Sequence, residues 1–167
     1  EACDLSIKAG ADQITIHLRE DRRHIQDADI FDVKAIADQR HTPLNLELGC
    51  NDDIVKRAIE LGPAWFCLVP EKREERTTEG GLDLLQRAQQ QKVSKVCLQL
   101  KEAHPNSKIS LFVEAKESIL EQVIKLPVDA VEIHTGDYAK LELEGNDYSH
   151  VTQQFVHMAN FIRAEGL

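Results

Sequence analysis

Ionisable side chains recur inside three short aliphatic segments of the sequence, where they alternate with the aliphatic residues. His17 and Arg19 occupy alternate positions in QITIHLR, and Glu47 lies between two leucines in LNLEL. Glu132 and His134 alternate with valine and isoleucine in AVEIH. Successive residues of a β-strand point to opposite faces. As strands, these segments would each have one aliphatic face and one face with ionisable groups.

The chemistry expected of such residues depends on where the polar faces lie. If each face were open to water, as on the wet side of an antiparallel sheet, the residues would need no function. If the faces line an interior, their charges are costly unless they are paired, so they should converge. Imidazole and carboxylate groups in one enclosed place can move protons, which predicts an acid/base site.

A basic cluster follows the first of these segments, in a chain that is acidic overall. Three arginines and a histidine surround Glu20 and Asp21 in HLREDRRHI: Arg19, Arg22, Arg23 and His24. Guanidinium groups match phosphate geometry, so the cluster indicates an anion site. The alternative is a network of surface ion pairs.

The segment VPEKREERTTEGGLD follows a third aliphatic run. Its hydroxyls at Thr77 and Thr78 and its glycines at Gly80 and Gly81 suit a ligand loop, although an ordinary loop before a helix has the same composition. Lys72 is a possible Schiff-base lysine, but the surrounding charges do not suggest the desolvated setting that activates one.

Strand-like and helix-like segments alternate along the whole chain. The expected strands are 13–18, 44–48, 64–69, 109–113 and 130–134, and the expected helices are 29–40, 51–61, 82–103, 117–125 and 149–165. Residues 1–12 resemble the end of a further helix that stops at Gly10. Regular alternation predicts a parallel α/β sheet in a single domain, with ligands at the carboxyl ends of the strands.

Five strands do not close a (β/α)8 barrel, which usually needs about 250 residues. The 167 residues are therefore either part of a longer barrel protein or an open, doubly wound sheet. The strand pattern does not choose between these two folds.

Composition and simple motifs exclude several classes of function. The formal charge of −9 argues against general nucleic-acid binding, which depends on surplus Lys and Arg. The sequence has no signal peptide or long apolar span, so we expect no membrane association and a cytoplasmic protein. The four widely spaced cysteines are expected to be reduced and buried. No metal-ligand spacing, G-x-G-x-x-G or Walker loop is present.

Four motifs, in order, resemble those of the pyridoxine 5'-phosphate synthase family: HLREDRRHI from His17, NLE from Asn45, LVPEKREERTTEGGL from Leu68 and VEIHTGDYA from Val131. The resemblance runs nearly end to end. It implies a (β/α)8 barrel, with residues 1–167 as a single incomplete domain holding strands two to six.

The resemblance also implies an activity and roles for individual residues. The family condenses 1-deoxy-D-xylulose 5-phosphate with 3-amino-2-oxopropyl phosphate to give pyridoxine 5'-phosphate, phosphate and water. It implies His17 and Glu47 as acid/base groups, Glu132 as a stabilising carboxylate, and Arg19, His24 and Thr77 as ligands of the pentulose phosphate. No metal or organic cofactor is implied, and the family forms homo-oligomers, typically octamers.

Some expected parts of the family site lie outside the sequence. The family's first strand and its last two βα units supply further substrate ligands and a proton donor. We therefore expect the 167 residues alone to be inactive. One alternative is a truncated, inactive barrel fragment that keeps an anion-binding loop. Another is a phosphate-handling aldolase or epimerase, although the strands have no lysine or metal-ligand set for that chemistry.

Overall fold

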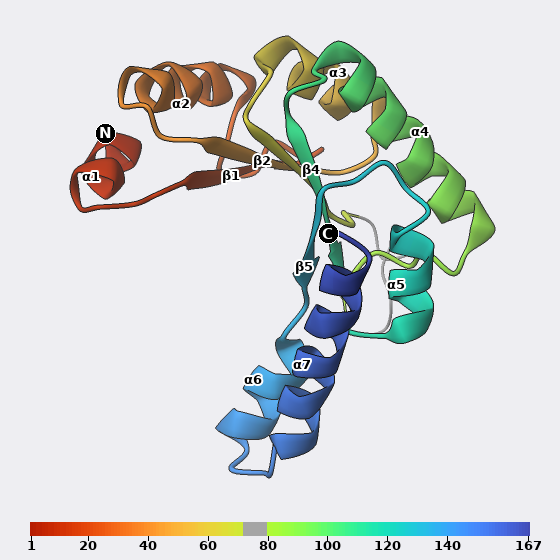
Figure 1. Cartoon of the computed structure of the whole chain (residues 1–167). Coiled ribbons are helices and arrows are strands. Elements are labelled where there is room, and N and C mark those ends of the chain that lie inside the picture. The colour runs from red at the N-terminus through yellow and green to blue at the C-terminus, as the bar shows by residue number, and fades with distance from the viewer. Residues whose placement is uncertain (72–79) are drawn as a thin grey trace.

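The computed structural model describes residues 1–71 and 80–167, in which helices and parallel strands alternate (Figure 1). The strands are β1 (Ile14–Leu18), β2 (Leu44–Leu48), β3 (Trp65–Leu68), β4 (Lys108–Val113) and β5 (Ala130–Ile133). The helices are α1 (Ala2–Lys8), α2 (Asp27–Gln39), α3 (Asp52–Leu61), α4 (Arg87–Ala103), α5 (Glu117–Val123), α6 (Gly136–Leu143) and α7 (Ser149–Ala164).

The five strands form one parallel sheet in the order β1-β2-β3-β4-β5, which confirms the predicted α/β class. A doubly wound sheet reverses its strand order at a switch point. Within the described residues the order does not reverse, and Figure 1 shows α2 to α5 following one another along one side of the sheet. This is the winding of a (β/α)8 barrel over five of its strands.

The ends of α2 and α3 follow from local side-chain chemistry. The Asn51 side chain accepts a hydrogen bond from the backbone N–H of Asp53 at 2.9 Å, and Gly62 ends α3 in the left-handed conformation (φ 58°). Gln26 and Asp29 form a capping box at the start of α2, which therefore begins two residues earlier than predicted. Caps of this kind satisfy backbone groups that the first and last turns leave without helical partners.

The prediction that one helix spans 82–103 was wrong at its start, because α4 begins only at Arg87. The backbone N–H of Leu82 donates to the carbonyl of Phe112 at 2.9 Å, which ties this residue to β4. The Asp83 side chain then accepts from the backbone N–H of Leu85 and from the Gln86 amide. These local bonds compete with helical ones and delay the helix by one turn.

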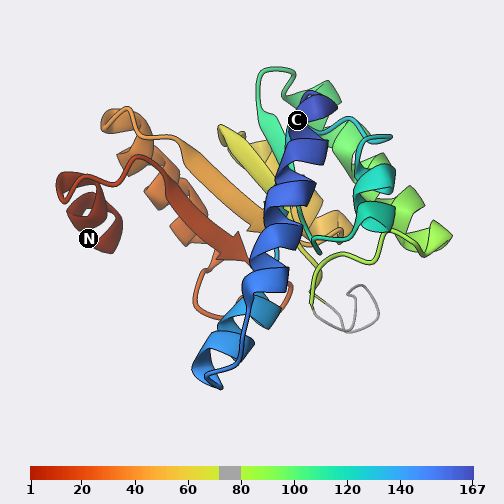
Figure 2. The same ribbon diagram turned by 60° about the horizontal axis from the view of Figure 1, so that its bottom comes forward.

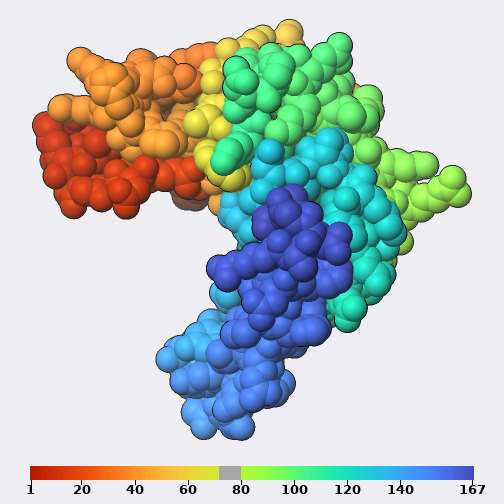
Figure 3. Space-filling model, in the orientation of Figure 1, coloured from red at the N-terminus to blue at the C-terminus, as the bar shows by residue number. Residues whose placement is uncertain are grey.

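A short helix, α6, follows β5 and was not among the expected helices. It packs with α7, where Tyr138 and Tyr148 meet edge to face with ring centroids 4.8 Å apart. Figure 3 shows α6 and the start of α7 projecting from the molecule, while the later part of α7 packs near α5.

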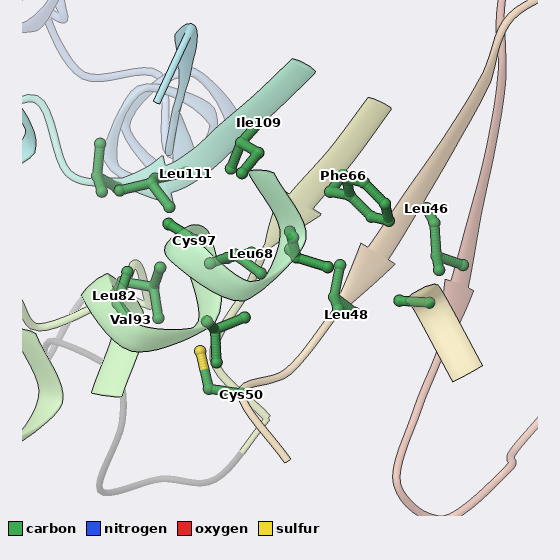
Figure 4. Packing of buried hydrophobic residues seen from close by; sticks show 14 of the residues in the cluster. Leu46, Leu48, Cys50, Phe66, Leu68, Leu82, Val93, Cys97, Ile109 and Leu111 are labelled. Carbon is green, nitrogen blue, oxygen red and sulfur yellow. The ribbon is translucent and has the colours of Figure 1, made fainter. Parts of the chain in front are cut away.

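The hydrophobic core lies between the sheet and its covering helices. Residues of β2, β3 and β4 meet residues of α4 there, as Figure 4 shows for Leu46, Leu48, Phe66, Leu68, Val93, Cys97, Ile109 and Leu111. Leucine, isoleucine and valine make up most of this core, as expected from a chain with 5% aromatic residues.

All four cysteines are free, as predicted. Cys50, Cys67 and Cys97 are buried, whereas Cys3 is only partly so. No helix in residues 1–71 and 80–167 is long and apolar enough to cross a membrane.

Candidate active site

His17 and Glu47 lie side by side on the face of the sheet opposite the aliphatic core. They are register partners on the neighbouring strands β1 and β2, which Figure 2 shows running in the same direction. His17 Nδ1 is 3.7 Å from Glu47 Oε2, and both side chains are partly exposed. They border a cavity of about 230 Å³, whose other lining residues are Val69, Pro70, Gly80 and Phe112.

Glu132 joins the same face from β5. Its Oε1 accepts a hydrogen bond of 2.8 Å from the Ser110 hydroxyl of β4. Both residues line a second hollow of about 470 Å³, together with Gln13, Thr15, Asn45, Trp65 and Ala130. The structure therefore places on one face the three residues for which the family resemblance implies catalytic roles, His17, Glu47 and Glu132.

The electrostatics of this face separate Glu47 from an ordinary surface glutamate. Burial raises the pKa of Glu47, an effect that nearby His17 opposes and the charge of Glu132 reinforces. A carboxyl with a raised pKa, beside an imidazole and a cavity, is suited to accepting and returning a proton.

The raised pKa of Glu47 predicts a pH-dependent cost to stability. Because folding favours the neutral carboxyl, this stabilisation is fully present below the unfolded pKa of about 4.3 and is lost as pH rises through the folded pKa. Glu47→Gln should therefore raise Tm at pH 7.5 by about 2–4 °C, the shift that about 1 kcal/mol gives in a domain of this size.

Thermal unfolding of both proteins between pH 4.5 and 7.5 checks this expectation. The advantage of the glutamine variant should shrink toward the acidic end. A constant difference, or one that grows on acidification, would contradict the stated sign.

Two further residues on this face, Ser110 and Cys67, were not predicted as part of the site. They are register partners on β4 and β3, and both are buried. Burial raises the pKa of the Cys67 thiol far above its ordinary value, so this cysteine stays protonated and unreactive. Strand parity could have found Ser110, because it alternates with Ile109 and Leu111 as Glu47 alternates with leucines.

A second histidine–carboxylate contact lies at the carboxyl end of the sheet. His134 Nδ1 is 3.4 Å from Glu114 Oε2, and Glu114 Oε1 accepts from the backbone N–H of Gly81 at 2.7 Å. A Cβ at Gly136 would lie 2.5 Å from the His134 ring, so glycine leaves room for this histidine. The predicted loop glycines and the end of β5 are thus joined through a buried carboxylate.

The arginines after β1 form the ion-pair network that was the alternative to an open anion site. Arg22 pairs with Asp27 (3.1 Å) and also with Asp53, which fixes the loop against two helices. Arg19 and Arg23 pair with Asp21 at 3.2 and 3.3 Å. An anion would have to compete with Asp21 for Arg19.

The described contacts do not bring the predicted phosphate ligands Arg19, His24 and Thr77 together. His24 is exposed in the loop after β1, in a left-handed backbone conformation (φ 72°). Thr77, like Thr78 and Lys72, lies outside the described residues. Within the described part of the chain, no group of three or more His, Cys, Asp or Glu is arranged to hold a metal ion.

Comparison with known proteins identifies the family. The sequence model of the family described as "Pyridoxal phosphate biosynthesis protein PdxJ" matches residues 1–167. The chain belongs to this PdxJ family. Proteins named pyridoxine 5'-phosphate synthase are 44% identical over 160 residues in Coxiella burnetii and 44% identical over 143 residues in Colwellia psychrerythraea. These alignments cover 96% and 86% of this chain.

This PdxJ-family chain spans 62% of the length of the Coxiella relative and 55% of the Colwellia relative. A crystal structure of D-psicose 3-epimerase with D-tagatose from Clostridium cellulolyticum aligns over 79% of this chain and 55% of its own, with a TM-score of 0.44 and 13% identity. The barrel-like winding described above rests on the strand order of the PdxJ-family chain itself.

Proposed function

We propose that the protein is a pyridoxine 5'-phosphate synthase, which condenses 1-deoxy-D-xylulose 5-phosphate with 3-amino-2-oxopropyl phosphate. The observation that carries this proposal is that His17, Glu47 and Glu132 lie on one face of the sheet and line two open hollows there. Membership of the PdxJ family indicates these substrates. Relatives that align with most of this chain are named for the same activity.

The side chains suit the proton movements of such a condensation. Imine formation, loss of phosphate, loss of water and ring closure each need a proton moved at carbon or oxygen. Glu47, with its raised pKa, can accept a proton and return it, while His17 Nδ1 lies close enough to share that exchange. Glu132, anchored by the Ser110 hydroxyl, supplies a fixed negative charge for cationic imine intermediates.

Phosphate binding and assembly belong to the same proposal. Arg19 lies two residues beyond His17 on the same strand parity, where a guanidinium can reach a substrate phosphate, and His24 and Thr77 complete the proposed ligands. We further propose that β1 to β5 are the second to sixth strands of an eight-stranded barrel, and that the whole protein is a cytoplasmic homo-oligomer without an organic cofactor or metal.

The alternative of an inactive barrel fragment is not favoured by these relationships. The matched relatives are named as synthases, and His17, Glu47 and Glu132 lie on one face of the sheet. The activity of the 167 residues by themselves stays a prediction. We expect no activity, because this chain matches only 62% of the length of the Coxiella relative.

The test is direct assay of the complete polypeptide with both phosphorylated substrates. Formation of pyridoxine 5'-phosphate and inorganic phosphate in equal amounts is the expected result, and omission of either substrate is the control. The 167-residue chain, assayed beside it, should give no product. A folded complete polypeptide that forms no pyridoxine 5'-phosphate would overturn the proposal.

A further inference from the structure

Glu71 contacts the ring nitrogen of His17 that does not face Glu47. It follows β3, and its side chain is 5% exposed. Glu71 Oε1 is 3.5 Å from His17 Nε2, while Glu71 Oε2 accepts a 2.8 Å hydrogen bond from the backbone N–H of Glu20. The second bond anchors the carboxylate to the loop after β1, so the imidazole contacts two carboxylates, Glu47 on β2 and Glu71 after β3.

The space for Glu71 is made by Gly49, the residue after β2. A Cβ at Gly49 would lie 2.9 Å from Glu71 Cγ, 3.0 Å from Cδ and 3.1 Å from Oε1. Any larger residue would push the carboxylate away from its position. Gly49 therefore lets the Glu71 side chain pack at the end of β2, within reach of His17.

The two carboxylates beside His17 differ in their electrostatics. Burial raises the pKa of Glu71, but contacts with His17 and the Glu20 backbone N–H, together with the charge of Arg19, outweigh burial and leave the pKa below its ordinary value. Burial instead raises the pKa of Glu47. Paired carboxyl groups whose pKa values are moved in opposite directions usually take different roles.

An ionised carboxylate can accept hydrogen bonds but cannot donate one. His17 Nε2 and Glu71 Oε1 are both shielded from solvent, so a bare Nε2 facing Glu71 would place two acceptors together in a buried space. The arrangement is favourable when Nε2 carries the proton. In the neutral ring, Nδ1 is then left as the acceptor, facing Glu47.

We propose that Glu71 is a positioning residue, which orients the His17 ring and keeps a proton on Nε2 so that Nδ1 exchanges protons with Glu47 or substrate. This inference deepens the proposed function, and its catalytic consequence rests on it. The orientation of the ring is a property of the protein alone and can be measured without substrate.

The first test is the tautomer of His17, measured by nitrogen NMR of ring-labelled histidine in the complete polypeptide. The His17 resonances are assigned by their loss in His17→Gln. In the native protein the neutral ring should be protonated at Nε2. Glu71→Gln has a side-chain amide that can donate as well as accept, so the ratio of the Nε2–H to the Nδ1–H form should fall about tenfold.

Two further variants test the position of the carboxylate and control for the loss of a negative charge elsewhere. Gly49→Ala keeps the carboxylate but displaces it, and should lower the tautomer ratio in the same direction as Glu71→Gln. Glu60→Gln removes an exposed carboxylate that pairs with Arg57 on α3, and should leave the His17 resonances unchanged. Gly49→Ala also tests the proposal if Glu71→Gln does not fold. An unchanged ratio in the folded variants would overturn it.

Kinetics then link the positioning role to the reaction. Glu71→Gln should lower kcat about 10- to 100-fold, as other carboxylates that orient a functional histidine do, while KM changes less than about twofold. Glu71→Asp, which keeps the charge, should recover part of the loss. Native kcat in Glu71→Gln would overturn the inference. If the native protein lacks synthase activity but the tautomer changes as expected, the proposed function fails while the positioning of His17 stands.

Discussion

Glu47→Gln should abolish the proposed synthase activity while leaving the protein folded. Glutamine has nearly the shape of glutamate, but its amide does not accept and return a proton. Because Glu47 lies 3.7 Å from His17 and borders the cavity, we expect kcat to fall about 10²- to 10⁴-fold, the usual contribution of a general acid or base. Steady-state release of inorganic phosphate in the presence of both substrates measures the loss.

A matched substitution on the opposite side of the sheet serves as control for this experiment. Glu121 is an exposed carboxylate on α5, and Glu121→Gln should keep native kcat and KM. Unfolding curves for both variants show whether the fold is intact. If Glu47→Gln turns over at the native rate, another group must move the proton and the proposed role of Glu47 is wrong.

Phe66→Ala should be the most destabilising single substitution in the described core. Phe66 is fully buried in the central strand β3, between its register partners Leu46 and Ile109 (Figure 4). Its ring centroid lies 6.1 Å from that of His104. Truncation leaves a cavity between the sheet and its helices. Large-to-small changes of this kind cost about 3–5 kcal/mol.

Denaturant unfolding of the complete polypeptide measures this cost. Phe31 on α2 provides the comparison, because its side chain is 41% exposed and its truncation should change the free energy of unfolding by less than about 1 kcal/mol. A loss below about 1 kcal/mol for Phe66→Ala would mean that the sheet and helices can close around the gap.

Much of the site could be predicted because strand parity is a local property. The alternation around His17, Glu47 and Glu132 can be recognised from the residues next to each of them in the sequence. The structure places all three on the polar face. The contribution of Glu71 depends instead on how the chain turns after β3 and on the space left by Gly49. No short-range pattern contains that information.

The basic cluster after β1 shows a different limit of sequence-based prediction. Its composition alone did not separate an anion site from ion pairs, because the deciding partners include Asp27 and Asp53, which come from later helices. The start of α4 was mispredicted for a similar reason. Leu82 is hydrogen-bonded to β4, an interaction between residues 30 positions apart that helical periodicity does not include.

The unreversed order of the strands allows the site to form progressively during synthesis. Each strand pairs with the strands before and after it in the chain, so the contacts of the sheet are close in sequence and can form progressively. His17 and Glu47 meet once β1 and β2 have paired, and Glu71 joins them with β3. Glu132 is added only with β5, so the proposed acid/base pair can meet before the carboxylate proposed to stabilise its intermediates.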